Sequence, residues 1–83
     1  MRTKELIIEI VEELVTYDAE VTRDSKIEDD LRIDFYDRCE IMDGINDEYG
    51  LHMSLTDMFG KDWEQSTVGE LIDNVLQKLG RLR

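Results

Sequence analysis

The chain has 83 residues, the size of one small domain, with 41% hydrophobic residues, 37% charged residues and a net charge of −11. A chain of this length buries roughly 60% of the surface that its unfolded form exposes. Its charge repels nucleic acid and anionic membranes, no run approaches the ~18 apolar residues of a membrane span, and there is no signal-peptide pattern. We therefore expect a single cytoplasmic domain over residues 1–83, a monomer that binds neither nucleic acid nor membrane.

The first predicted helix covers about residues 4–16, with Thr3 as its N-cap. Apolar residues recur there at the i, i+3, i+4 and i+7 spacing of one helix face. These are Ile7, Ile10, Val11 and Leu14. Ile8 and Val15 widen the apolar arc, so this helix is expected to contact two neighbours.

Residues 17–33 show no sustained hydrophobic period and are predicted to form a long loop. A structureless loop of this length is unusual in a compact domain. We expect four apolar residues to hold it against the core, and a short turn near residues 25–30. The four are Val21, Ile27, Leu31 and Ile33.

The second predicted helix starts after Asp34, an N-cap with Asp37 at the capping-box position, and ends at Gly50. Gly44 lies in its middle, where glycine costs about 1 kcal/mol relative to alanine. This glycine indicates either close approach by a partner or neighbouring helix, or drift at an exposed position. The predicted inward stripe, which makes Cys39 a core thiol, is Phe35, Cys39, Met42, Ile45 and Tyr49.

Negative charge is concentrated in and before this helix. Residues 28–50 hold nine acidic residues and two arginines, a net charge of −7 and more than half of the total. Such a field steers basic protein surfaces toward the helix. The alternative is a solvated face that only aids solubility.

Two further helices complete the predicted fold. Ser54 and Asp57 form a capping-box signal for a short third helix that Gly60 ends, and the loop over residues 61–66 carries Trp63. The last helix opens with Thr67 and Glu70 as a capping box and closes at Gly80. Its inward stripe is Val68, Leu71, Ile72, Val75 and Leu79. Three longer helices and a short third one predict an all-α four-helix bundle.

The residues that catalysis or metal binding requires do not occur in usable patterns. A single cysteine excludes an internal disulfide and a cysteine-rich metal site. A calcium loop starting at Asp29 would place Leu31, Ile33 and Asp34 where oxygen ligands and a glycine are needed. His52, the only histidine, has no evident nucleophile to activate or acid to orient it. We expect neither an enzyme nor a metal site.

The stretch from Leu31 to Tyr36, Leu-Arg-Ile-Asp-Phe-Tyr, followed by an acidic helix and Tyr49-Gly50-Leu51, resembles the acyl carrier protein family. In that family a loop ends in Leu-Gly-Ala-Asp-Ser-Leu before an acidic helix. The resemblance continues through Val21-Thr22, residues 29–31 and residues 67–71, and so covers nearly the whole chain. It implies an acyl-carrier-like four-helix bundle with a long first loop, and a place beside fatty-acid, polyketide or specialised lipid biosynthesis.

The sequence departs from the family at its attachment serine. That serine, which carries 4′-phosphopantetheine, corresponds to Phe35 after Asp34, and a phenyl ring has no hydroxyl for a phosphodiester. No cofactor is therefore expected here. Phe35 is either ordinary core or a ring at the mouth of the bundle, where it fills the cargo's path or meets a partner.

The resemblance also implies a protein partner with a basic surface patch. Asp43 departs from the family, which has an apolar contact residue at that position. The expected interaction is attraction by the acidic helix followed by burial of an apolar anchor, Phe35, Tyr36 or Ile41. The expected partner-binding residues are Asp34, Phe35, Tyr36, Asp37, Glu40, Ile41 and Asp47.

These observations predict a non-carrier interaction module, with two alternatives. One is a genuine carrier that uses another attachment site, for which Ser25, Ser54 and Ser66 are the only serines. The other is an unrelated acidic binder or inhibitor, such as a nucleic-acid mimic.

Overall fold

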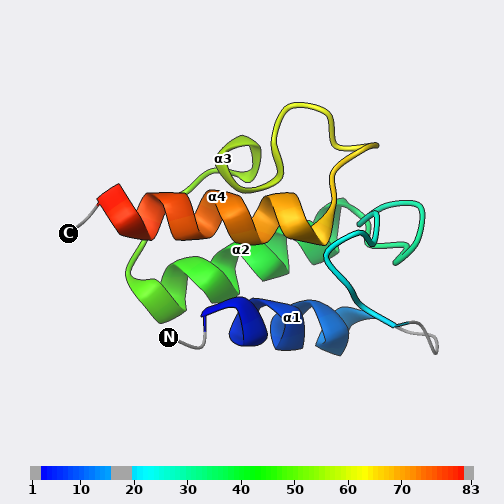
Figure 1. The fold of residues 1–83 in the computed structure, drawn as a ribbon, viewed down its shortest axis with the longest axis horizontal. Coiled ribbons are helices and arrows are strands. Elements are labelled where there is room, and N and C mark those ends of the chain that lie inside the picture. The colour runs from blue at the N-terminus through cyan, green and yellow to red at the C-terminus, as the bar shows by residue number, and fades with distance from the viewer. Residues whose placement is uncertain (1–2, 16–19, 82–83) are drawn as a thin grey trace.

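A computed structural model describes residues 3–15 and 20–81 of the chain. It has four helices: α1 (Thr3–Leu14), α2 (Phe35–Tyr49), α3 (Leu55–Phe59) and α4 (Val68–Arg81) (Figure 1). Outside the helices, Lys26 and Thr67 meet in an isolated antiparallel bridge. The prediction of an all-helical fold with a short third helix is confirmed. The predicted end of the first helix at residue 16 lies outside the described residues.

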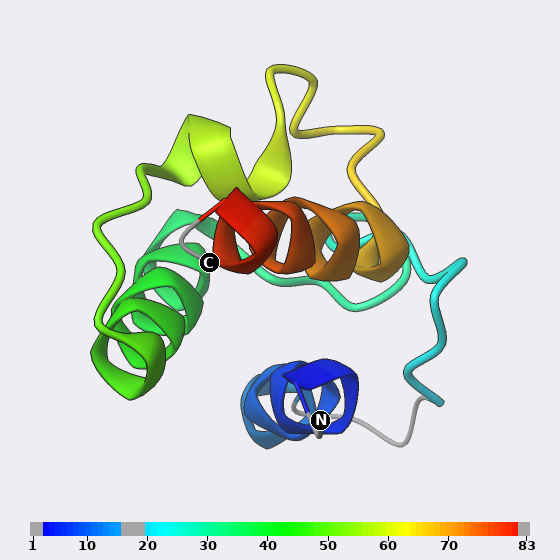
Figure 2. The ribbon, with the colours of Figure 1, turned by 60° about the vertical axis from the view of Figure 1, so that its left-hand side comes forward.

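The three longer helices run along the molecule, and α2 and α4 begin at the end where α1 finishes (Figures 1 and 2). α1 packs against both α2 and α4, and α3 packs against the same two helices. The expectation that the first helix contacts two neighbours is therefore confirmed. Because α2 and α4 start at one end, the long first loop and the loop before α4 meet there.

Thr3 is part of α1 rather than its cap. The residue has 2% exposed surface, and its hydroxyl has no hydrogen-bond partner among the described residues. Thr3, Ile7 and Val11 are spaced four residues apart and are the buried residues of α1. The predicted cap is wrong because this spacing places Thr3 on the face that packs into the core.

The N-cap Asp34 and the terminal glycine Gly50 of α2 are as predicted. The Asp34 carboxylate accepts a hydrogen bond from the Asp37 N–H at 2.9 Å. At the other end Gly50 adopts a left-handed conformation with φ 64°, and its N–H donates to the Asn46 carbonyl. Both signals act within four residues of the helix end, so the sequence alone specifies them.

The predicted inward stripe of α2 is confirmed at Ile45 and otherwise lies about one residue around the helix from the buried face. Its buried residues are Arg38, Ile41 and Ile45, while Phe35 is half exposed. The helix is packed between α1 and α3, which centres the buried face on these three positions and draws an arginine inside. The remaining members of the predicted stripe are only half-buried: Cys39, Met42 and Tyr49. Cys39 is therefore not the enclosed core thiol that was predicted.

The first loop is held against the core as expected. Ile27, Leu31 and Ile33 are buried and Val21 is half-buried against them. The predicted turn is present, because the N–H groups of Asp30 and Leu31 both donate to the Lys26 carbonyl.

The same loop also caps α4. The N–H groups of Val68 and Gly69 donate to the carbonyls of Ser25 and Arg23, at 3.0 and 2.9 Å. The Thr67 hydroxyl accepts from the Glu70 N–H at 3.2 Å. The first turn of a helix leaves its N–H donors unpaired. In α4, the donors of Val68 and Gly69 are satisfied by a segment more than 40 residues earlier in the chain.

α3 is fixed by a complete capping box. The Ser54 hydroxyl accepts from the Asp57 N–H, and the Asp57 carboxylate accepts from the Ser54 N–H, both at 3.1 Å. The Ser54 N–H lowers the pKa of Asp57, and the Ser54 hydroxyl and the charge of Lys78 act in the same direction. Gly60 ends the helix with φ 81°, as predicted. The predicted stop at Gly80 is wrong: this glycine stays helical and α4 continues to Arg81.

Two helical glycines allow a matched test of packing. In Gly44→Ala the new methyl group would lie 3.9 Å from Ile10 of α1, an ordinary contact. We expect this variant to raise the free energy of unfolding by about 1 kcal/mol, the intrinsic helix preference for alanine. In Gly69→Ala the methyl group would lie 3.0 Å from the Arg23 carbonyl oxygen, which is backbone. We expect this variant to lower the free energy of unfolding by roughly 1–3 kcal/mol, because the site is overpacked.

Urea unfolding followed by circular dichroism measures both effects. Changes of the same sign in the two variants would contradict this description of the α1–α2 and loop–α4 contacts.

Candidate functional site

Three aromatic side chains meet where α2 begins. Phe35 and Tyr36, the first two residues of α2, are 50% and 76% exposed. Trp63, from the loop between α3 and α4, is half-buried. The Phe35 ring stacks on Trp63 with 6.0 Å between centroids and 28° between planes, and it contacts Tyr36 edge-on at 5.9 Å and 81°. We call these three residues the aromatic tip.

A buried arginine lies beneath the aromatic tip. Arg38 has 2% exposed surface, and its guanidinium carbon is 5.1 Å from the centroid of the Trp63 ring and 5.7 Å from that of Phe59. Its Nη2 donates to the Trp63 carbonyl at 2.9 Å and lies 3.9 Å from the Glu28 carboxylate. Arg38 therefore joins α2 to α3, to the loop before α4 and to the first loop.

The rings and the carbonyl do more to stabilise the buried charge of Arg38 than Glu28 does. Glu28 is 45% exposed and lies near the outer limit of an ion pair, so water screens the interaction. A charge-assisted hydrogen bond and two aromatic faces act in a drier environment, where each is stronger. The Nε of Arg38 is buried with no hydrogen-bond partner among the described residues. A site with two ring faces and one carbonyl acceptor suits a planar guanidinium and would not suit a lysine ammonium.

The structure separates the predicted partner-binding residues into two groups. Phe35 and Tyr36 are accessible at the tip, whereas Ile41 is completely buried in the core. Ile41 is therefore corrected from an expected surface anchor to a core residue, because it belongs to the face of α2 that packs against its neighbours. The acidic members are exposed or half-buried: Asp34, Asp37, Glu40 and Asp47.

These carboxylates follow the length of α2 rather than gathering at one point. With a rise of 1.5 Å per residue, Asp34 and Asp47 lie about 20 Å apart along the helix. We call the exposed or half-buried carboxylates of α2 the acidic face; they are Asp37, Glu40, Asp43, Asp47 and Glu48. The aromatic tip is at the start of the helix that carries this face, so one partner can contact both.

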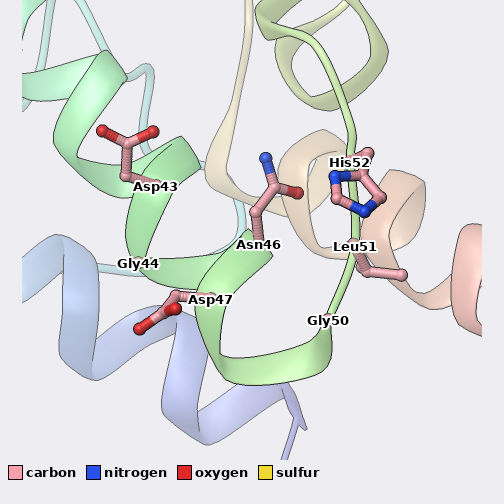
Figure 3. A pocket seen from close by; sticks show the side chains of 7 residues that line it. All are labelled: Asp43, Gly44, Asn46, Asp47, Gly50, Leu51 and His52. Atoms are coloured by element: carbon pink, nitrogen blue, oxygen red, sulfur yellow. The ribbon is translucent and has the colours of Figure 1, made fainter.

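A shallow open depression lies near the end of α2 (Figure 3). The Asn46 amide there pairs with the backbone of Met53 through two hydrogen bonds of 3.0 Å. His52 is exposed, and the carboxylates of Asp43 and Asp47 point away from it (Figure 3). Asn46 thus has a structural task, the positioning of the connector after α2. The depression is lined by Asp43, Gly44, Asn46, Asp47, Gly50, Leu51 and His52.

Neither a metal cluster nor a membrane span is found in the part of the chain that the structure describes. Over residues 3–15 and 20–81, no three His, Cys, Asp or Glu side chains are grouped so as to hold a metal ion. Within the same ranges, none of the helices combines the length and apolar character needed to cross a bilayer.

Arg38 and Trp63 were not predicted as members of the site. A signal for Arg38 exists, since it shares a helix face with Ile41 and Ile45 at the i, i+3, i+7 spacing. For Trp63 the only signal is that the chain's single tryptophan lies in a loop. Its contact with Phe35 depends on how that loop folds back to α2.

Removal of the Arg38 side chain tests its role. We expect Arg38→Ala to lower the free energy of unfolding by about 2–4 kcal/mol, through the lost charge-assisted hydrogen bond and the lost packing of its aliphatic stem. The fluorescence emission of Trp63, the only tryptophan, should also change because the Arg38 guanidinium no longer lies over its ring. Arg23→Ala is the matched control, since Arg23 pairs with Asp73 on the exposed surface. Such a pair is worth about 1 kcal/mol or less. Equal losses in the two variants would show that burial of Arg38 has no special role.

Phe35→Ala distinguishes a core ring from a surface ring. The Phe35 ring is half exposed and stacks on one aromatic neighbour. We therefore expect Phe35→Ala to lower the free energy of unfolding by about 1 kcal/mol. Phe59→Ala removes a fully buried ring and should cost roughly 3–5 kcal/mol. Urea unfolding of the two variants gives the comparison, and a loss at Phe35 that equals the loss at Phe59 would place Phe35 in the core.

Comparison of the chain with protein-family models, with curated proteins and with solved structures gives no match.

Proposed function

We propose that this chain is an acyl-carrier-like domain that carries no cargo and acts as a protein-interaction module beside fatty-acid, polyketide or specialised lipid biosynthesis. The observation that carries the proposal is the place of Phe35. It is the first residue of α2, directly after the N-cap Asp34, and its ring is half exposed. In the resembling family this position holds the serine that bears the phosphopantetheine arm.

The order and form of the elements support the carrier-like part of the proposal. A long loop separates α1 from α2, an acidic α2 starts at an aspartate cap, and a short α3 precedes α4. The sequence resemblance extends along the same elements, from the first loop to the start of α4. These features are what the resemblance implies for the fold.

The aromatic tip and acidic face support the interaction part. Carboxylates spread over about 20 Å of α2 create a field that attracts a basic surface before contact. Phe35 and Tyr36 then offer apolar surface that a partner can cover. Charged residues mainly set the rate and selectivity of association, and aromatic anchors contribute most to affinity. The acid at Asp43, where the family has an apolar residue, favours a different partner from the usual enzymes.

The alternative of a carrier with another attachment site has less support. Ser25 and Ser66 have 7% and 0% exposed surface, so a transferase cannot reach their hydroxyls without local unfolding. Ser54 is exposed, but its hydroxyl accepts the Asp57 N–H in the capping box of α3. Modification there would remove the bond that begins the helix.

Incubation with coenzyme A and a broad-specificity phosphopantetheinyl transferase, analysed by intact mass, tests the proposal. We expect the wild-type chain to gain no mass, because Phe35 has no hydroxyl. Phe35→Ser should be modified at residue 35, since it restores a serine after Asp34 at the start of α2. Phe35→Ala is the control for non-specific labelling.

An adduct on the wild-type chain would overturn the non-carrier proposal. Failure of a folded Phe35→Ser variant to accept the group would instead remove the support for a carrier-like surface at this position.

A further inference from the structure

We infer that the aromatic tip binds an arginine side chain of the partner, with the guanidinium stacked on the face of the Tyr36 ring. This inference rests on the proposed interaction function and names the chemistry that the partner brings to the site. The tip would then supply selectivity for arginine that the acidic face alone cannot give.

The protein contains the same type of contact one layer deeper. The guanidinium of Arg38 lies near Trp63 and Phe59, at 5.1 and 5.7 Å from the ring centroids. Phe35 stacks on Trp63, and Tyr36 contacts Phe35 edge-on. A series of cation and rings therefore runs from the core outward and ends at the two most exposed rings of the cluster.

The outer rings are accessible to a further cation. Tyr36 is 76% exposed and Phe35 is 50% exposed, and the two rings are nearly perpendicular. A cation placed over an aromatic face is attracted by the negative charge of that face. Because a plane cannot stack on two perpendicular rings and ring edges are positive, the guanidinium stacks on the face of Tyr36, the more exposed of the two.

Acidic residues flank the residues of the aromatic tip in the chain. Asp34 and Asp37 flank Phe35 and Tyr36 in the chain, and Asp62 and Glu64 flank Trp63. Three of the four are exposed, and Asp37 is half-buried. The two segments that carry the rings, residues 34–37 and 62–64, hold acidic residues and no basic residue, and so attract a positive side chain. A second copy of this chain, with a net charge of −11, would be repelled from the same place.

Arginine fits this surface better than lysine. Its guanidinium is planar, stacks on aromatic faces, and can bond a carboxylate through two N–H groups at once. The lysine ammonium is a compact, strongly hydrated charge that gains less from a ring. We therefore expect the acidic face to attract arginine and lysine equally. The aromatic tip should prefer arginine.

Two blocked peptides of equal charge, Gly-Arg-Arg-Gly and Gly-Lys-Lys-Gly, are the probes. Titration of the wild-type protein at low salt, followed by the NMR signals of the Tyr36 and Phe35 rings and the Trp63 indole, should give roughly three- to fivefold tighter binding of the arginine peptide. Tyr36→Ala should remove this preference and leave binding of the lysine peptide unchanged. Leu76→Ala, which truncates an exposed apolar side chain on α4, should keep it.

The outcomes separate this inference from the proposed function. Equal affinity for the two peptides, or a preference that persists in Tyr36→Ala, would overturn the arginine site and leave charge-driven docking in place. Absence of binding by either peptide at low salt would overturn both. Because Tyr36 is largely exposed, its variant keeps the fold and the comparison remains valid.

Discussion

The burial of Arg38 is the interaction on which the rest of the structure depends. Its guanidinium lies on the inner side of an acidic helix, bonds the Trp63 carbonyl, and is covered by the Trp63 and Phe59 rings. These contacts bring together α2, α3 and the loop before α4, and Glu28 adds the first loop at longer range. A buried charge is stable only when its surroundings satisfy it, so the positions of these segments are linked to one another.

This constraint also determines what the start of α2 presents to solvent. Since Trp63 is held over Arg38, its ring provides a base on which Phe35 stacks, and Tyr36 completes the cluster at the surface. In our proposal a partner meets these rings at the place where a carrier would display its serine. The negative charge along α2 guides the approach, and the rings select what is bound. In the same proposal, Phe35 both replaces the attachment serine and makes the aromatic contact with Trp63.

The sequence predicts the ends of α2 and α3 and the apolar residues that the first loop buries, but it misplaces the buried face of α2 and the ends at Thr3 and Gly80. The caps at Asp34, Ser54, Gly50 and Gly60 depend on bonds within about four residues, so local residue types specify them. Which face of α2 is buried depends on α1, α3 and a loop 25 residues away in the chain. Hydrophobic spacing therefore placed Phe35 on the inward stripe, and the family resemblance made Ile41 an expected surface anchor, since neither takes account of these long-range contacts. The acidic part of the candidate site was predictable, whereas the contact between Phe35 and Trp63 required the fold.

The most direct test of this account is a double-mutant cycle between Arg38 and Trp63. The free energy of unfolding is measured by urea and circular dichroism for the wild type, Arg38→Ala, Trp63→Ala and the double variant. If the guanidinium and the indole stabilise the fold together, the sum of the losses in the two single variants exceeds the loss in the double variant by about 1 kcal/mol or more. Losses that add within about 0.3–0.5 kcal/mol would mean that the two residues act independently, and would contradict the central role assigned to Arg38.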